Sequence, residues 1–329
     1  MQTAGAPALI RVVNLCVRYG ERRALEGLSF EVRGGEVMGL LGPNGAGKTT
    51  SLSVLATLRT PSSGMAEVAG HRTDRAPDLV RRVLGYVPQN LAIYPTLTAR
   101  ENIDFFARLF GLRGAVGRDV ARRALSVVGL AERADDIVST FSGGMQRRLN
   151  LACGLLHQPR VVLLDEPTVG VDPQSRQRIF EAVRAQADAG AAVLYSTHYM
   201  EEAERLCDRV VLVDGGRVVA AGTPAALVDE AGGGMHLEIE TRAPLSAGWL
   251  DDVPEAQLAL APELIAGAAR DAGGRRSGSR VRVSLVDPAG AARVLERASS
   301  SGGGVLDFHL QQPTLQEVFL RLTGHAMRD

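Results

Sequence analysis

The hydrophobic and polar positions of the first 230 residues predict buried strands that alternate with helices. Residues 36–41, 161–164 and 191–195 are short apolar runs, the pattern of strands that are buried on both faces of a sheet. Residues 10–33 predict strands joined by a short connection, because Leu28, Phe30 and Val32 alternate with polar neighbours. This succession of elements predicts an α/β fold for the first part of the chain.

Helical periodicity appears after residue 48 and again between residues 96 and 140. Leu52, Leu55 and Leu58 recur at helical spacing, and Pro61 ends the pattern. A further helix is expected from about 117 to 128, ending at Gly129. Another helix is expected between these two, with one apolar face that consists of Ile103, Phe106, Ala107 and Phe110 and ends before Gly111. We therefore expect a helical subdomain over about 90–140.

The last third of the chain predicts a second, smaller domain. Asp214-Gly215-Gly216 separates two apolar runs and predicts a hairpin near the end of the first domain, which we place at residues 8–230. Gly232-Gly233-Gly234 marks a linker. Beyond it, alternating strands around 237–239 and 281–285, a helix over about 288–299, a strand over 305–310 and a terminal amphipathic helix predict an α+β domain at 235–325.

Composition narrows the possible partners. The chain has 329 residues, which favours two domains, and its 37 basic and 37 acidic side chains give no net charge. With only 4% aromatic residues, neither an electrostatic nor a base-stacking surface for nucleic acid is expected. The three cysteines are far apart and fit small buried side chains in a reducing cytosol. No stretch approaches the roughly 18 apolar residues of a membrane span, so we expect any membrane role to depend on a partner chain.

One motif contains the only lysine of the chain. Lys48 stands in a Gly-x4-Gly-Lys-Thr loop, whereas every other basic residue apart from histidine is arginine. A predicted strand precedes the loop and a predicted helix follows it, as in the loops whose backbone N–H groups cradle a polyphosphate. In such loops the lysine reaches the terminal phosphates and the threonine hydroxyl binds Mg²⁺. The loop comprises Gly42, Pro43, Asn44, Gly45, Ala46, Gly47, Lys48 and Thr49.

Two more segments have the chemistry of a phosphate-transfer site. Asp165 and Glu166 follow a buried strand, where open α/β sheets place their functional groups. Asp165 is expected to hold the Mg²⁺ shell through water, and Glu166 to orient or deprotonate the attacking water. Ser142-Gly143-Gly144 opens a predicted helix and suits an anion, although the same sequence is also a common flexible turn.

The order of these motifs along the chain resembles that of ABC transporter ATP-binding subunits, over roughly residues 8–228. The resemblance implies a P-loop ATPase fold with a mixed sheet and a helical subdomain, and a site for ATP that extends to Thr50. It further implies that Tyr19 stacks on adenine, that Gln89 contacts Mg²⁺ and water, and that His198 senses the γ-phosphate. The resemblance also implies that Asp172 ends a loop that communicates across a dimer. Taken alone, a tyrosine such as Tyr19 or a histidine such as His198 is more often structural than functional.

The tail narrows the resemblance to the daunorubicin/doxorubicin-resistance type. Residues 313–320 read Pro-Thr-Leu-Gln-Glu-Val-Phe-Leu, followed by Leu322-Thr323-Gly324. One departure is Met145, where the family usually has glutamine after the two glycines. The resemblance implies a peripheral subunit on the cytoplasmic side of the membrane, which exports a drug-like or lipid-like molecule through a separate permease. Two copies would enclose two ATP molecules, with Ser142, Gly143 and Gly144 completing the partner's site.

Three other functions remain open at this point. A soluble ATPase acting on nucleic acid or ribosomes lacks support, since there is one cassette and no long coiled coil. A non-catalytic nucleotide sensor is disfavoured by the intact Glu166 and His198. An importer ATPase is disfavoured by the tail.

Overall fold

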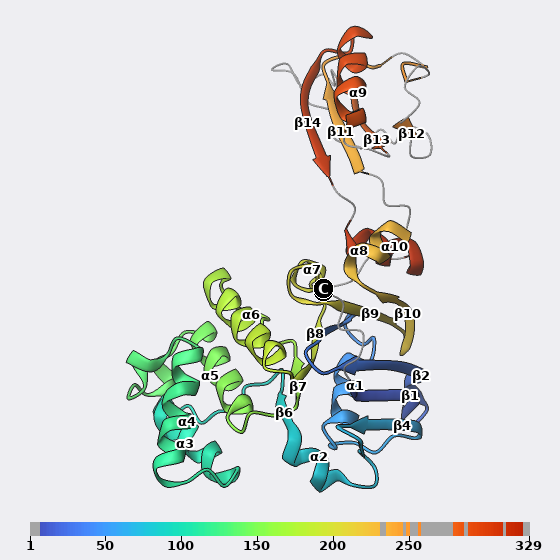
Figure 1. Ribbon diagram of the computed structural model, residues 1–329. Helices are drawn as coiled ribbons and strands as arrows, with labels where there is room; N and C mark the ends of the chain where they lie inside the picture. Colours follow the sequence, from blue (N-terminus) through green and yellow to red (C-terminus); the bar gives the residue numbers. More distant parts are fainter. Residues whose placement is uncertain are drawn as a thin grey trace. The chain divides into compact units, whose positions relative to one another are not determined.

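The chain divides into two compact units. The computed structural model describes residues 7–230, 235–245, 248–250, 256–257, 279–285, 289–311 and 314–324. Unit 1 comprises residues 1–224 together with 322–329, and unit 2 comprises residues 225–321. Each unit has its own sheet and core (Figure 1). The expected linker at Gly232-Gly233-Gly234 lies outside the described residues.

A six-stranded sheet forms the centre of unit 1. Five of its strands run parallel. The sixth, β10 (Arg217–Gly222), pairs antiparallel with its neighbour as the second arm of the predicted hairpin. Three of them are buried along their whole length, which confirms the strands predicted from continuous apolar runs. In spatial order the strands are β10 (Arg217–Gly222), β9 (Arg209–Asp214), β3 (Val37–Leu41), β8 (Ala192–Thr197), β7 (Val161–Asp165) and β6 (Leu84–Val87).

A second, antiparallel sheet packs against the first across the core of unit 1. Its strands are β2 (Arg22–Arg33), β1 (Ala8–Tyr19), β4 (Ser63–Val68) and β5 (His71–Arg72). The shared core contains side chains from β1, β2, β3, β7 and β8, together with the first helix, α1 (Lys48–Leu55). This packing fixes the start of α1 beside the ends of β3 and β7, where the predicted motifs lie.

Helices cover the other parts of unit 1. Figure 1 shows α3 to α6 grouped away from the antiparallel sheet, and α3, α4 and α5 contact one another, as expected for a helical subdomain. Short 3-10 turns at Ala131–Arg133 and Val138–Thr140 connect α4 to α5. The helices are α2 (Pro77–Val83), α3 (Ala99–Leu109), α4 (Gly114–Val127), α5 (Gly143–Leu155), α6 (Pro173–Asp188) and α7 (Met200–Leu206).

One predicted boundary is wrong. The helix after the phosphate loop was expected to include Leu58 and to end at Pro61, but α1 ends at Leu55. Thr57 adopts a left-handed conformation with φ of 59°, which stops the helix before Leu58. Leu58 is consequently 67% exposed and contributes nothing to the predicted apolar face.

Unit 2 contains a small antiparallel sheet with a helix packed on it. In spatial order its strands are β12 (Ala256–Gln257), β13 (Ser279–Leu285), β11 (Met235–Thr241) and β14 (Val305–Gln311). Leu237, Ile239 and Val283 form its core with Val294 and Ala298 of α9 (Ala289–Ser300). Two more helices, α8 (Pro224–Glu230) and α10 (Leu315–Thr323), flank this part of the sequence. The strands and helices predicted for the tail are confirmed.

Candidate active site

The loop between β3 and α1 places the single lysine inside the protein. The Lys48 side chain is only 4% exposed, and its Nζ donates to the carbonyl oxygens of Gly42 at 2.7 Å and Pro43 at 3.1 Å. Gly47 has φ of 108°, and a Cβ built there would lie 2.5 Å from a methyl carbon of Leu25. Only glycine fits this position, so the backbone can turn tightly into the helix.

The end of β7 brings two carboxylates to the same place. Asp165 accepts hydrogen bonds from Ser196 Oγ at 2.8 Å and from Thr49 Oγ1 at 3.2 Å. Burial raises the pKa of the Asp165 carboxyl above its ordinary value. Glu166 has φ of 46°, a costly conformation for a residue with a side chain. Such backbone strain is common at functional sites, and here it turns the Glu166 side chain off the line of the strand.

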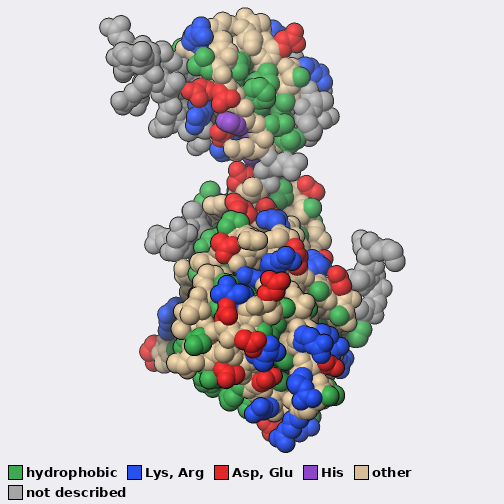
Figure 2. Space-filling model, turned by 90° about the vertical axis from the view of Figure 1, so that its left-hand side faces the viewer, with side chains coloured by type: hydrophobic (Ala, Val, Ile, Leu, Met, Phe, Trp, Pro, Cys, Tyr) green, Lys and Arg blue, Asp and Glu red, His purple; other side chains and the backbone are tan. Residues whose placement is uncertain are grey.

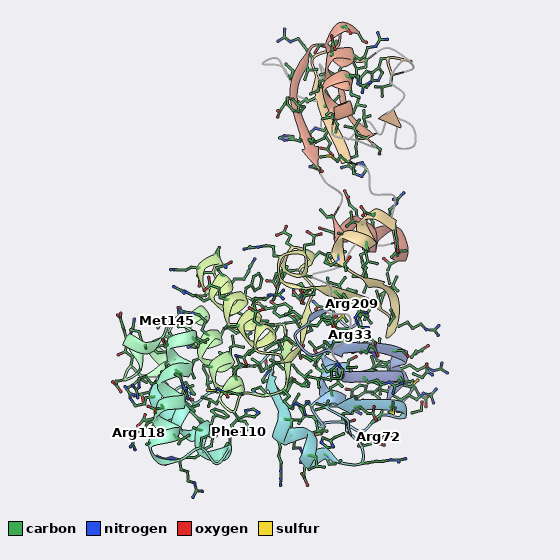
Figure 3. All side chains as sticks on the ribbon, viewed as in Figure 1. Arg33, Arg72, Phe110, Arg118, Met145 and Arg209 are labelled. Carbon is green, nitrogen blue, oxygen red and sulfur yellow. The ribbon has the colours of Figure 1, made fainter. Side chains whose placement is uncertain are left out.

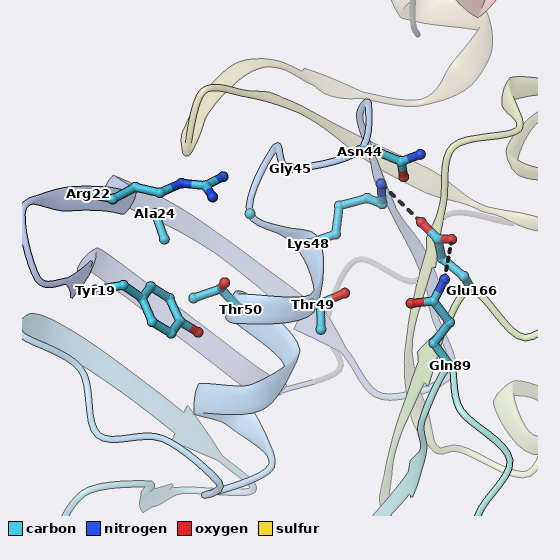
Figure 4. Close-up of a pocket in the computed structure, with 11 residues that line it drawn as sticks. Tyr19, Arg22, Ala24, Asn44, Gly45, Lys48, Thr49, Thr50, Gln89 and Glu166 are labelled. Carbon is cyan, nitrogen blue, oxygen red and sulfur yellow. Dashed lines mark hydrogen bonds and ion pairs between the residues drawn. The ribbon is translucent and has the colours of Figure 1, made fainter. Parts of the chain in front are cut away.

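Glu166 is the centre of the cluster. Its Oε1 lies 3.1 Å from Lys48 Nζ and 3.3 Å from His198 Nδ1. Its Oε2 accepts from Gln89 Nε2 at 3.2 Å. Figure 4 shows Lys48 and Gln89 meeting Glu166 at one edge of the pocket. The structure thus brings together four side chains, from the phosphate loop and from the segments that follow β6, β7 and β8, that are separated by up to 150 residues in the sequence.

A cavity of about 490 Å³ extends from this cluster to Tyr19 (Figure 4). The predicted residues that line it are Tyr19, Asn44, Gly45, Gly47, Lys48, Thr49, Thr50, Gln89 and Glu166. Arg22 and Ala24 also line it. Sequence reasoning missed these two, although they follow Tyr19 across a hairpin turn. Arg59, also missed, stacks its guanidinium carbon 3.7 Å from the centre of the Tyr19 ring, so one face of that ring is already covered.

The predicted anion-binding turn lies elsewhere. In the part of the chain that the structure describes, Ser142, Gly143 and Gly144 do not line this cavity, nor do Gly42, Pro43, Ala46, Asp165, Asp172 and His198. Ser142 caps α5, with its Oγ accepting from Met145 N at 3.3 Å, and Figure 3 places Met145 in the helical part of unit 1. A Cβ added to Gly143 would meet nothing within 4 Å, so the turn has open space around it.

Asp172 takes part in the packing of that turn. Its carboxylate caps α6 by accepting from Ser175 N at 2.9 Å, and this hydrogen bond holds the Asp172 pKa below its usual value. A Cβ built on Gly144 would lie 2.6 Å from Asp172 Oδ2 and 2.5 Å from Ser175 Oγ. The starts of α5 and α6 are therefore in close contact, and Gly144 is needed for that approach.

A buried carboxylate that sequence reasoning missed supports the segment carrying His198. Glu202 Oε2 accepts from three hydroxyls: Thr168 at 2.8 Å, Tyr195 at 2.9 Å and Thr197 at 3.0 Å. Its Oε1 lies 3.4 Å from Arg176 Nε. Burial and the neighbouring carboxylate raise the pKa of the Tyr195 hydroxyl, which keeps that group protonated and able to donate. No sequence motif indicated Glu202, because two of its partners, Thr168 and Arg176, are distant in sequence.

Replacing Glu202 by alanine is expected to lower the free energy of unfolding by about 3 kcal/mol, since three buried hydroxyls and Arg176 lose their shared acceptor. Denaturant unfolding measures the change. Its neighbour Glu201 is exposed and provides the matched control, with an expected change below about 0.5 kcal/mol. Equal effects of the two substitutions would contradict the assignment.

The donor set fits a metal-bound polyphosphate. Thr49 Oγ1 and Asp165 Oδ1 are hard oxygen donors within 3.2 Å of each other, the kind that Mg²⁺ prefers. Lys48 Nζ supplies a cation next to the N-terminus of α1, where backbone N–H groups favour negative charge. The fold and this site define a P-loop nucleotide-binding protein.

Comparison with known proteins identifies the family within that class. Residues 25–169 match the family described as ABC transporter. The chain is 41% identical to daunorubicin resistance ATP-binding protein DrrA2 of Streptomyces coeruleorubidus, over 94% of this chain and 92% of the relative. It is 36% identical to linearmycin resistance ATP-binding protein LnrL of Bacillus subtilis (strain 168), over 98% and 100%. It is 37% identical to Nod factor export ATP-binding protein I of Ralstonia nicotianae, over 99% and 97%.

A solved structure agrees with the sequence relatives. An ATP-binding cassette determined as a dimer in a post-hydrolysis state, with ADP and Pi, matches at a TM-score of 0.59 and 27% identity, covering 65% of this chain and 98% of that one. The chain therefore belongs to the ATP-binding subunits of ABC transporters and is an ATP hydrolase. The predicted resemblance and the ABC-type P-loop fold are confirmed. None of the helices formed by the described residues combines the length and apolar character needed to cross a bilayer.

Proposed function

We propose that this chain binds Mg-ATP in the cavity between Tyr19 and Glu166 and hydrolyses it to drive export through a separate permease. The observation that carries the proposal is the meeting of Lys48, Gln89 and Glu166 at one end of that cavity, with His198 in contact with Glu166. Tyr19 at the other end offers an aromatic face for adenine. Thr49, Gln89 and Asp165 would hold Mg²⁺, which neutralises phosphate charge when bound.

Each residue of the cluster has a distinct part in the reaction. Lys48 exchanges its contact with Glu166 for the phosphates, which leaves the Glu166 carboxylate available as an acceptor for a water proton. Gln89, which already donates to Glu166, orients that water. His198 hydrogen-bonds the γ-phosphate, and Thr197, held by Glu202, fixes the segment that carries it. The backbone of residues 42–50 cradles the phosphates, with Pro43, Asn44, Ala46 and Thr50 completing the loop.

Two copies of the chain would form each complete site. The turn Ser142-Gly143-Gly144 starts a helix outside the cavity of its own chain and has open space at Gly143, which supports its use by a partner. The dimeric cassette among the solved structures supports the same arrangement. Asp172, which lies next to Gly144, would then transmit the closure of one ATP site to the other ATP site. ATP shifts the equilibrium because it binds the closed dimer more tightly than the open chains.

The segment at 94–98 is proposed to contact the permease. Tyr94 is 45% exposed and packs edge-on against Phe105, with ring centres 5.0 Å apart. The buried Asn102 side chain holds the loop by accepting from Tyr94 N at 2.7 Å and donating to Tyr94 O at 2.9 Å. An exposed apolar surface on an ordered loop suits a protein partner. Because Gln89 lies just before this loop, movement of the permease would reach the nucleotide site.

The relatives indicate the class of molecule exported. They include resistance proteins for daunorubicin and linearmycin and a Nod factor export protein, so a drug-like or lipid-like molecule is the proposed substrate. The subunit would act at the cytoplasmic side of the membrane without binding nucleic acid. Residues 8–230 would form the nucleotide domain, with its helical part at about 90–140, and residues 235–325 an accessory domain.

ATPase activity with and without the permease tests the proposal. We expect the chain, co-expressed with its permease and reconstituted in vesicles, to hydrolyse ATP several-fold faster than the chain alone. Removing the Tyr94 ring (Tyr94→Ala) should abolish the stimulation and leave the basal rate unchanged. Robust activity that no membrane partner changes would favour a soluble ATPase, whereas substrate accumulation in the direction of uptake would favour an importer.

A further inference from the structure

The outer strand of unit 2 has an apolar surface that its own core does not cover. Within the described part of this unit, β14 pairs with β11 alone and forms one edge of the sheet. Leu306, Phe308 and Leu310 on β14 are 46%, 51% and 40% exposed. Figure 2 looks from the side on which β14 lies in Figure 1, and hydrophobic side chains gather there beside acidic residues and a histidine. Exposed apolar edge strands are sites of strand addition.

The strand register explains the exposure. Phe308 is opposite Ile239, and Leu310 is opposite Leu237, so these apolar side chains lie on the core face of the sheet. Ile239 and Leu237 are fully buried, whereas their neighbours on β14 are not. Among the described strands, the apolar face therefore continues past the core of this unit to the edge formed by β14.

Side chains at the centre of β14 contact one another and the backbone beside them. Phe308 N donates to Oδ1 of Asp307 at 2.8 Å. Oδ2 of Asp307 lies 3.3 Å from His309 Nε2, and both of these side chains are at least 60% exposed. Asp307 and His309 thus present an acidic and a basic side chain in contact with each other on the exposed strand.

Asp307 and His309 lie on the two sides of Phe308 on β14. If two copies pair antiparallel with the two-fold axis at Phe308, Phe308 faces itself, Leu306 faces Leu310, and Asp307 faces His309 of the other copy. Within residues 306–310, each apolar side chain meets an apolar one, and the Asp307 carboxylate meets the His309 imidazole. An isologous interface needs this self-complementarity. We propose that β14 joins two copies of this chain into a continuous sheet without nucleotide, independently of the ATP-dependent contact.

Cysteine crosslinking of the full chain tests the register. In the proposed pairing, the two Phe308 Cα atoms are about 4.5–5.5 Å apart, within disulfide range. Phe308→Cys in a Cys16→Ser background should therefore form a crosslinked dimer in nucleotide-free protein under mild oxidation. Leu310→Cys is the matched control and should not crosslink, because position 310 faces 306. Equal crosslinking of the two variants, or none in either, would overturn the register.

A charge exchange provides a second, cysteine-free test. His309→Asp places carboxylates opposite each other and should raise the dimer dissociation constant about tenfold at pH 6. Adding Asp307→His restores opposite partners and should restore association, as measured by sedimentation equilibrium without ATP. A monomeric wild-type chain, or a double variant as weak as the single one, would reject the interface. Loss of permease co-purification in Phe308→Glu, with wild-type chain monomeric alone, would assign the edge to the permease instead.

Discussion

Replacing Glu166 by glutamine is expected to lower the rate of ATP hydrolysis by at least about 100-fold while ATP binding is retained. Glutamine has nearly the same shape but cannot accept the water proton. It keeps the turn at φ of 46° and a side chain that contacts Gln89. ATP should then remain between two chains, so the dimer accumulates. Single-turnover hydrolysis and light scattering with Mg-ATP measure the two effects.

ATP-dependent dimerisation has to be distinguished from association through β14, and a second substitution achieves this. The substitution is best made together with Phe308→Glu, which removes any nucleotide-independent pairing by that strand. The expected result is a monomer without ATP and a dimer with it. A chain that stays monomeric with ATP would reject the shared site. Turnover close to that of the parent would show that Glu166 is not the base.

Continuous apolar runs allowed the central sheet to be predicted because its parallel strands have no solvent face. Val37–Leu41 and Val161–Asp165 are buried at every position, and such a pattern has few alternatives. The phosphate loop was predictable for a similar reason: glycines, a lysine and a threonine at fixed spacing serve one geometry. The strand before it and the helix after it supplied the required context.

Helix ends and long-range polar contacts were not predictable in the same way. α1 stops before Leu58 because Thr57 takes a left-handed conformation, which the leucine spacing does not encode. Glu202 looks like a solvated residue on an acidic helix, and only the fold brings Thr168 and Tyr195 to it. Arg59 reaches Tyr19 from the segment after α1. These contacts depend on how the sheets pack, not on local sequence.

Removing the Lys48 side chain is expected to abolish measurable hydrolysis and to weaken ATP binding at least about tenfold. Lys48 is the buried cation of the cluster, and a charge-assisted hydrogen bond to phosphate contributes about 1.5–3 kcal/mol. Lys48→Ala is measured by nucleotide titration and steady-state phosphate release. Lys48→Arg should not rescue turnover, because the planar guanidinium needs space that the carbonyl oxygens of Gly42 and Pro43 occupy.

Arg22→Ala is the matched control, since Arg22 is another cationic side chain that lines the same cavity but is exposed. We expect it to reduce ATP affinity only slightly and to leave the maximal rate unchanged, because an exposed charge is well screened. If Arg22→Ala and Lys48→Ala were equally damaging, the cavity would bind phosphate through general positive potential. Near-normal turnover of Lys48→Ala would remove the phosphate loop from the mechanism. Lys48→Arg and Arg22→Ala together test why a chain with 36 arginines has a single lysine. The expected results mean that the site requires a compact ammonium and not charge alone.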